Sequence, residues 1–358
     1  MRAAILEAFG RPLVVRSVPD PVIGTGEVVV DVAAAPVLSY THEIISNARR
    51  YPIEPPLVLG CGAIGRVRAT GPDATRLAIG DWVFCDPMVR SRDDARDPDI
   101  TLQGWSTRGT GGLKLARHHH DGPFATQIRV PTENAIAIGP IDPADAPQWA
   151  SLCLSLVPYG GWLAGRLAPG ETVAVSGATG HFGSAAVAVA IAMGAARVVA
   201  PGRNTRVLDD LVSRFGERVT PVTLCGDAGE DTARIASAAG PIDVVLDLLP
   251  PSVSTQVVRA AAMAVRRRGR IVLMGGVGML GGDDLALPYP WIMRNDISII
   301  GQWMYPPSAV PSLVALVRAG LLALDLDDVT TFPLEQANDA IAHAAEHGGA
   351  FRMTVIAP

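Results

Sequence analysis

The stretch Val173-Ala-Val-Ser-Gly177-Ala-Thr-Gly180-His-Phe-Gly183-Ser-Ala-Ala decides the fold class of this chain of 358 residues. A short apolar strand leads into three glycines spaced GxxGxxG, and an Ala-rich helix is expected from Phe182 to Met193. The pattern is a variant of the dinucleotide-binding fingerprint, in which the glycines permit a tight turn, close approach of the pyrophosphate and close helix packing. The helix amino terminus adds free N–H groups and partial positive charge for the phosphates. The alternative is an inert Gly-rich loop.

Further short apolar strands follow this turn, with Ala-rich helical segments between several of them. This alternation predicts an α/β fold with a doubly wound parallel sheet. The expected strands are Thr172–Val175, Arg197–Ala200, Ile242–Leu246, Arg270–Met274 and Ile297–Ile300.

The segments before and after this strand–helix alternation have a different sequence pattern. The first 150 residues are rich in short strands bounded by Gly and Pro turns, and the end of the chain predicts helices near Pro311–Ala319 and Leu334–His347 before a strand at Phe351–Ile356. Because the length also favours two domains, we expect residues 1–150 and 303–358 to share one domain. Residues 151–302 would form the cofactor domain.

The bulk properties exclude several classes of protein. A formal charge of -5 without a basic tail argues against nucleic acid as a partner. The longest apolar stretch, Ala185–Ala196, is too short to span a membrane, and no secretion signal is recognisable at the amino terminus. Four scattered cysteines suit a reducing compartment, so we expect a cytoplasmic protein; they are Cys61, Cys85, Cys153 and Cys225.

The end of the second strand of the sheet bears on the choice of cofactor. NAD-specific sites usually place an acid there to bind the ribose hydroxyls, but this chain reads Val199-Ala-Pro-Gly-Arg-Asn-Thr-Arg206. Without an acid, Arg203 and Arg206 are able to neutralise a 2′-phosphate. NADP(H) is therefore favoured over NAD(H), the alternative being that both arginines are solvated residues at a helix start.

Several segments, in this order and spacing, resemble the medium-chain dehydrogenase/reductase superfamily, especially its zinc-independent, quinone oxidoreductase-like members. They include Gly26–Ala34, Pro56–Val67, Gly80–Val83, Gly122–Pro131, Gly177–Gly183 and Phe332–Ala340. The resemblance implies a GroES-like β-barrel catalytic domain, a Rossmann domain, an active site in the cleft between them and a homodimer.

The resemblance also implies the residues that contact the cofactor. The turn, the strand end, and the loops after the fourth, fifth and sixth strands carry them. They are Gly177, Ala178, Thr179, Gly180, His181, Phe182, Gly183, Gly202, Arg203, Asn204, Arg206, Leu248, Gly275, Gly276, Val277, Gln302 and Trp303.

The chain departs from alcohol dehydrogenases of this superfamily at the catalytic zinc. Val37 stands at the position of the first ligand, Cys61 at the second, and only Cys153 matches the third. Valine cannot bind metal, and a catalytic zinc takes three protein ligands, so we expect a zinc-free enzyme. The two thiols would be small buried apolar groups, with an adventitious metal or mutual oxidation as alternatives. His118, His119 and His120 are interpreted as an exposed loop without a metal.

Without zinc, another group must hydrogen-bond or protonate the substrate oxygen. Tyr40 is the first candidate, with Ser39 to orient it and His42 to connect it to solvent. The alternatives are a packed aromatic for Tyr40 and a structural role for His42. Aromatic candidates for the pocket, or equally for the core, are Trp303, Tyr305, Trp105 and Trp291.

Together these features predict a zinc-independent, NADPH-dependent oxidoreductase that transfers hydride to an enone, quinone or carbonyl substrate, which is expected to be flat or apolar. An alcohol dehydrogenase acting on an alcohol and its aldehyde or ketone is the alternative. From another class, the alternative is a non-catalytic NADPH-binding sensor or interaction protein.

Overall fold

The computed structural model describes residues 1–358 and divides the chain into two compact units. The first unit, called the N-terminal unit below, contains residues 1–153, 324–348 and 352–358. The second, called the cofactor unit, contains residues 154–323 and 349–351. Each unit is described by itself.

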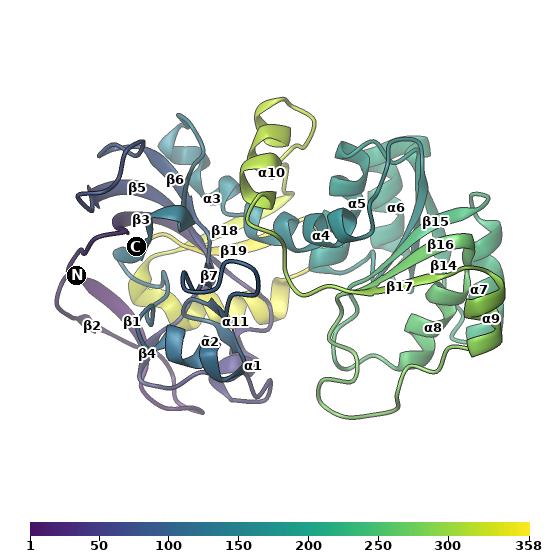
Figure 1. Ribbon diagram of the computed structural model, residues 1–358, viewed down its shortest axis with the longest axis horizontal. Helices are drawn as coiled ribbons and strands as arrows, with labels where there is room; N and C mark the ends of the chain where they lie inside the picture. The colour runs from purple at the N-terminus through teal and green to yellow at the C-terminus, as the bar shows by residue number, and fades with distance from the viewer. The chain divides into compact units, whose positions relative to one another are not determined.

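The cofactor unit is built on one parallel sheet of six strands in the order β14-β13-β12-β15-β16-β17 (Figure 1). This is the order of a dinucleotide-binding fold, in which the chain reverses direction across the sheet between the first and fourth strands, here β12 and β15. The strands are β12 (Thr172–Ser176), β13 (Arg197–Gly202), β14 (Val219–Thr223), β15 (Ile242–Asp247), β16 (Val265–Leu273) and β17 (Ser298–Gly301).

Helices connect these strands, and polar residues at their starts explain where three of them begin. Asn204, Asp227 and Ser254 each accept a hydrogen bond from a backbone N–H in the first turn of the helix that follows. The helices are α4 (Leu152–Ala164), α5 (His181–Ala192), α6 (Thr205–Phe215), α7 (Ala228–Ser237), α8 (Thr255–Met263), α9 (Tyr289–Arg294) and α10 (Ala309–Arg318), with a 3₁₀ turn at Gly216–Arg218.

One domain boundary differs from the expectation. Residues 303–323, predicted to belong with the N-terminal segment, lie in the cofactor unit. The reason is packing: Tyr305 is 3% exposed, and a Cβ at Gly160 of α4 would lie 2.7 Å from the Tyr305 Cβ. The segment after β17 therefore packs against α4.

The N-terminal unit is rich in antiparallel strands and has three sheets, with the orders β2-β1-β4, β7-β8-β9 and β11-β6-β5-β3-β19-β18, with β10 also paired to β3. Closure of these sheets into a barrel stays a prediction. The strands are β1 (Arg2–Leu6), β2 (Val14–Ser17), β3 (Glu27–Val37), β4 (Leu57–Val58), β5 (Ala63–Thr70), β6 (Trp82–Cys85), β7 (Met88–Arg90), β8 (Ile100–Leu102), β9 (Ser106–Arg108), β10 (Gln127–Pro131), β11 (Ala135–Ala137), β18 (Asp328–Phe332) and β19 (Arg352–Ile356).

The end of the chain completes this unit. β19 pairs antiparallel with β3, Thr354 opposite Val37, and β18 pairs with β19. The helices are α1 (Thr41–Ile45), α2 (Gly109–Ala116), α3 (Ala146–Trp149) and α11 (Ala337–His347), with 3₁₀ turns at Thr132–Asn134, Pro143–Asp145 and Leu334–Gln336. The first and last segments thus share a unit, as expected.

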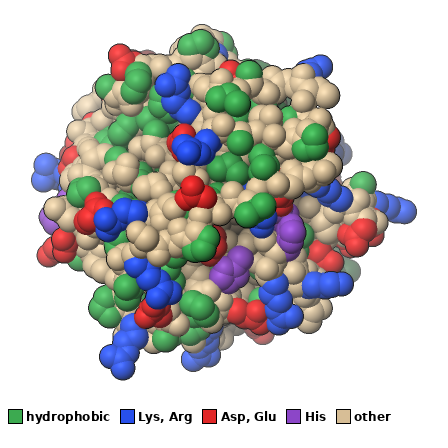
Figure 2. Space-filling model, turned by 90° about the vertical axis from the view of Figure 1, so that its left-hand side faces the viewer, with side chains coloured by type: hydrophobic (Ala, Val, Ile, Leu, Met, Phe, Trp, Pro, Cys, Tyr) green, Lys and Arg blue, Asp and Glu red, His purple; other side chains and the backbone are tan.

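Two further observations concern the surface and the helices. On the face drawn in Figure 2, acidic and basic side chains are interspersed, and histidine side chains reach the surface. None of the helices is both long enough and apolar enough to cross a lipid bilayer.

Candidate functional site

The glycine turn has the backbone geometry that dinucleotide binding requires. Gly177 directly follows β12 and has a φ of +94°, a conformation that side chains disfavour. The N–H of Gly180 donates to the Gly177 carbonyl oxygen at 2.9 Å, and Gly180 is the residue that caps α5. The amino terminus of a helix of 12 residues therefore stands directly behind the turn.

Two glycines are needed here for close packing. A Cβ at Gly183 would lie 1.9 Å from the Gly177 carbonyl oxygen, and a Cβ at Gly202 would lie 2.4 Å from Cγ2 of Thr179. Contacts this short do not occur between real atoms, so both positions exclude side chains. The start of α5 and the end of β13 are thereby held against the turn.

These elements border a cavity of about 330 Å³, within the range of small-molecule sites. Its walls come from the turn, the end of β13, the start of α8 and the loops after β14 and β15. The lining includes Ser176, Gly177, Thr179, Pro201, Gly202, Arg203, Leu224, Gly226, Asp231, Leu249, Ser252, Val253, Ser254 and Val257.

The structure separates the two arginines at the strand end. Arg203 lines the cavity, whereas Arg206 is exposed in the first turn of α6 and does not line it. Asn204 accepts from the N–H of Val207 at 3.3 Å, so its side chain caps the helix. Of the three, Arg203 is the residue placed to meet a phosphate.

The other predicted contact residues lie on loops at the same end of the sheet. The N–H of Leu248 donates to the Ser176 carbonyl oxygen at 3.0 Å, which ties the loop after β15 to the turn. A Cβ at Gly276 would lie 2.9 Å from Pro251, so the loop after β16 approaches the same region. The remaining positions are Ala178, buried in the turn, His181 and Phe182 at the start of α5, the partly buried Gly275 and Val277, and Gln302 with the 39% exposed Trp303 after β17.

Asp247 ends β15 and was not predicted as a site residue. It is 3% exposed, and its Oδ1 is buried without a hydrogen-bond partner. Burial raises the pKa of Asp247 to about 7, against the effect of hydrogen bonds from Ser176 and from the N–H groups of Leu249 and Gly275. Only glycine fits at 275, because a Cβ there would lie 2.3 Å from Asp247 Oδ2.

We expect the Asp247→Asn variant to gain stability over the wild type as pH rises from about 4 to about 8. The ordinary aspartate pKa is about 3.9, so between that value and about 7 the folded state binds the extra proton. The contribution of Asp247 to the free energy of unfolding is therefore fully present below its pKa in the unfolded state. It is lost as pH rises through its pKa in the folded state. Urea unfolding across this range measures the difference. Asp209→Asn, on the exposed surface of α6, is the control, and parallel curves for wild type and Asp247→Asn would contradict the assignment.

In the N-terminal unit, the residues predicted for proton transfer lie where β3 ends and α1 begins. Tyr40 packs edge-on against Trp105 with ring centres 5.8 Å apart, and the Arg49 guanidinium lies 4.0 Å above its ring. Burial raises the pKa of Tyr40 well above its ordinary value, with further contributions from Tyr51 and Cys61. The phenol is therefore neutral and is available as a hydrogen-bond donor.

Ser39 and His42 accompany Tyr40 in different ways. Ser39 is partly buried and lies against the backbone of Gly348. His42 is exposed, and its Nδ1 lies 3.1 Å from the Ser39 carbonyl oxygen. Their roles in orientation and in contact with solvent stay predictions.

Val37, Cys61 and Cys153 stand at the positions that the resemblance assigns to a catalytic zinc. Val37 is buried in β3 and offers no donor. Burial raises the pKa of the Cys61 thiol well above its ordinary value, with contributions from Cys153 and Asp86, so the two cysteines are near one another. The nearby Asp86 accepts from the N–H of Met88 at 3.0 Å. Of the three positions, two carry thiols and one carries a side chain without a donor, so the absence of zinc stays a prediction.

Three of the aromatic residues suggested for a substrate pocket have packing roles. Tyr305 is buried against α4, and Trp291 packs on the core of the cofactor unit formed by strands and α8. Trp105 is 2% exposed and packs on Tyr40. Of the four, only Trp303, two residues after β17, is a largely exposed side chain, at 39%.

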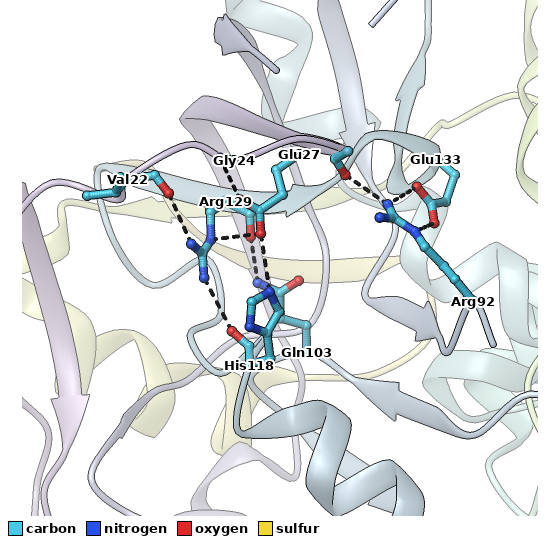
Figure 3. Close-up of polar contacts among 9 residues, drawn as sticks. Val22, Gly24, Glu27, Arg92, Gln103, His118, Arg129 and Glu133 are labelled. Atoms are coloured by element: carbon cyan, nitrogen blue, oxygen red, sulfur yellow. Dashed lines mark hydrogen bonds and ion pairs between the residues drawn. The ribbon is translucent and has the colours of Figure 1, made fainter. Parts of the chain in front are cut away.

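Of the histidine loop, His118 is exposed, as expected, whereas His119 and His120 are partly buried. His118 and His119 come together with Glu27 of β3, and one ligand atom from each lies within 4.8 Å of the others. Figure 3 shows the contact between Glu27 and His118. Burial, and then the charge of His118, lower the pKa of His119 to about 4. This group was not predicted from the sequence because its carboxylate lies far from the histidines along the chain.

Further residues that were not predicted from the sequence line the cavity. Asp231, Ser252 and Ser254 lie after strands β14 and β15, at the same sheet edge as the glycine turn. The oxygens of Asp231 accept from the N–H groups of Cys225 and Gly226, at 2.7 and 3.0 Å. Their position after the carboxyl ends of parallel strands is the signal that would have found them.

Comparison with known proteins gives consistent similarities. Residues 24–140 match the alcohol dehydrogenase GroES-like domain family, and residues 182–319 match the zinc-binding dehydrogenase family. An alcohol dehydrogenase of Rhizobium meliloti (strain 1021) is 29% identical over 281 residues, 77% of each chain. An acryloyl-coenzyme A reductase of Metallosphaera sedula is 28% identical over 306 residues, 84% of each chain. The structure of a thermostable alcohol dehydrogenase from Pyrobaculum aerophilum is 26% identical and superimposes with a TM-score of 0.77, covering 100% of this chain and 99% of that one.

Proposed function

Because the chain is an oxidoreductase of the medium-chain dehydrogenase/reductase superfamily, we propose that it is an NADPH-dependent reductase that works without zinc. The choice of NADPH rests on Arg203, which lines the cavity beside the glycine turn. The strand end that it follows has no acidic residue. When bound, the nicotinamide supplies hydride. The turn at Gly177 and the amino terminus of α5 would hold its phosphates.

The substrate class that we propose is a carbonyl compound with a conjugated double bond, a quinone or an enone. The similarity to an acryloyl-coenzyme A reductase supports reduction of a carbon–carbon double bond next to a carbonyl. Direct reduction of an aldehyde or ketone is the second candidate, supported by the similarity to alcohol dehydrogenases. The valine at position 37 favours the first, because it removes one donor of a zinc that would polarise the carbonyl.

Tyr40 is the residue that we propose for substrate contact in the N-terminal unit. Its neutral phenol donates a hydrogen bond to the substrate oxygen, where negative charge develops as hydride is added. The high pKa of the Tyr40 hydroxyl opposes complete transfer of its proton. Water would therefore supply the final proton, with Ser39 and His42 beside the path to solvent.

Replacing Tyr40 with phenylalanine is expected to lower kcat about 100-fold, the lower range for loss of one hydrogen-bond donor to a developing oxyanion, while the Kd for NADPH stays unchanged. Steady-state kinetics and titration of NADPH fluorescence measure the two quantities. Tyr289→Phe, which changes a 76% exposed tyrosine of the cofactor unit, is the control. Unchanged turnover in Tyr40→Phe would remove this residue from the mechanism.

The function itself is tested by the rates of NADPH and NADH oxidation with quinones, enones, aldehydes and ketones. Faster turnover of quinones or enones with NADPH supports the proposal. Turnover confined to aldehydes or ketones would assign the chain to the alcohol dehydrogenases, and tight NADPH binding without turnover would favour a sensor or interaction protein. We also propose a cytoplasmic homodimer, paired through the exposed edge strand β17.

A further inference from the structure

We propose that Glu27, His118 and His119 form a binding site for a divalent transition-metal ion, with Zn²⁺ as the best-fitting ion. All three residues belong to the N-terminal unit, and none is at a position of the relatives' catalytic zinc. Two imidazole nitrogens and one carboxylate oxygen are a common zinc ligand set.

The distances in the group already approach those of a coordination sphere. Ligands about 2.0–2.2 Å from a tetrahedral zinc are about 3.3–3.6 Å from one another. The Nε2 of His118 lies 3.4 Å from the Oε1 of Glu27, too far for a strong hydrogen bond. Since all three ligand atoms lie within 4.8 Å, small side-chain rotations suffice to bring them around one ion.

The backbone holds the carboxylate and the histidine loop in place. Glu27 is 6% exposed at the start of β3, and its Oε2 accepts from the N–H of Gly24 at 2.8 Å, which leaves Oε1 directed toward His118 (Figure 3). The N–H groups of His118 and His119 both donate to the Leu115 carbonyl oxygen at the end of α2. The site is therefore anchored from two elements distant in sequence.

Two polar atoms of this region have no partner of their own. His119 Nδ1 and Gln103 Oε1 are both buried without a hydrogen bond. Buried polar atoms are nearly always paired, so an ion with a bound water would satisfy groups that are otherwise costly. Gln103 belongs to this region because its Nε2 donates to the carbonyl oxygens of Asp121 and Arg129, each at 2.8 Å.

The guanidinium of Arg129 would compete with the metal ion for the Glu27 carboxylate. Its Nε lies 3.5 Å from Glu27 Oε1, but its other nitrogens donate to the carbonyl oxygens of Val22 and His118 at 3.0 and 3.3 Å. Arg129 thus keeps partners when an ion takes Oε1, and it also holds the backbone of His118. We expect its charge to limit the affinity to the micromolar range.

Although His118 and His119 are adjacent in the chain, a ligand atom of each lies within 4.8 Å of the other and of Glu27. The rings of His118 and His119 meet at 89° with centres 4.7 Å apart. His120 stands outside the group, with its Nδ1 2.9 Å from Asp121 Oδ1. Only two of the three consecutive histidines therefore serve as ligands.

Binding of Zn²⁺ and of Co²⁺, as a coloured substitute, to the full chain without a histidine tag and after chelator treatment tests the site. We expect one ion per chain, weak visible cobalt bands without an intense thiolate band, and a metal-dependent rise in Tm. His118→Gln and His119→Gln should each weaken binding about 100-fold or more, since loss of a mere supporting partner costs 10–100-fold.

The controls distinguish loss of a ligand from loss of the fold and from metal bound elsewhere in the chain. His118 has a side chain that is 66% exposed, so His118→Gln should keep the apo Tm and lose only the rise caused by metal. His347→Gln, in a stacked histidine pair of the same unit, should bind like the wild type. Unchanged binding in His118→Gln and His119→Gln, no binding at millimolar metal, or a thiolate band from Cys61 and Cys153 would each overturn the proposal. NADPH turnover does not enter this test, so the two proposals fail independently.

Discussion

Replacing Gly183 with alanine is expected to weaken cofactor binding strongly and to destabilise the cofactor unit. The added Cβ would lie 1.9 Å from the Gly177 carbonyl oxygen, and backbone on both sides must move to relieve the overlap. Overpacking of this kind costs about 1–3 kcal/mol or more. A displaced turn also loses alignment with the amino terminus of α5, so we expect NADPH affinity to fall about 100-fold, about 2.7 kcal/mol. Fluorescence titration and thermal unfolding measure the two effects.

Gly229→Ala provides the matched control for this change. Gly229 lies in the first turn of α7 in the same unit, and a Cβ there would have an ordinary contact of 3.4 Å with Asp227. Alanine in an open helical position stabilises by up to about 1 kcal/mol relative to glycine. The control should therefore bind NADPH normally with an equal or higher Tm. Normal binding by Gly183→Ala would show that the turn does not hold the cofactor.

Charge reversal at Arg203 is expected to invert the preference between the two nicotinamide cofactors. A hydrogen bond to a charged group contributes about 1.5–3 kcal/mol, and glutamate would replace that attraction with repulsion of the 2′-phosphate. We expect kcat/KM for NADPH to fall about 100-fold, whereas NADH, which lacks this phosphate, should be nearly unaffected. The measurement is kcat/KM for both cofactors with one acceptor.

Arg197→Glu makes the same change in charge at the opposite end of the same strand. Arg197 is the first residue of β13 and is exposed. It lies at the amino end of the strand, whereas Arg203 follows the carboxyl end. This variant should keep the wild-type cofactor preference, because only its distance from the phosphate site differs. Equal losses with NADPH and NADH in Arg203→Glu, or a wild type that prefers NADH, would contradict the assignment of NADPH.

The sequence predicted the strands well where a run of apolar residues coincides with a buried segment of the sheet. β12, β13 and β15 begin at the predicted residues because their apolar runs are fully buried between turns. β14 was not predicted: Pro221 interrupts its pattern, which is tolerated because the strand lies at the sheet edge. β16 begins at Val265, before the predicted strand. Its first residues were missed because this stretch is rich in arginine and lacks an apolar run.

The same distinction applies to the sites. The glycine turn is readable from sequence because seven consecutive residues, Gly177–Gly183, make it. The far wall of the cavity, with Asp231 and Ser254, depends on how the ends of separate strands meet. Likewise, the meeting of Glu27 with His118 depends on β3 and the end of α2 lying side by side, which no local pattern contains.

The pairing of β19 with β3 has a consequence for how the protein is made. Residues 35–37 find their strand partner only at residues 354–356, so they are synthesised long before it. The cofactor unit, nearly all of it within residues 154–323, leaves the ribosome before residues 354–356 and is free to fold as a domain of its own. Until the last residues emerge, the end of β3 carries unpaired backbone groups, a risk of aggregation. Synthesis of residues 354–356 thus completes the sheet that contains β3.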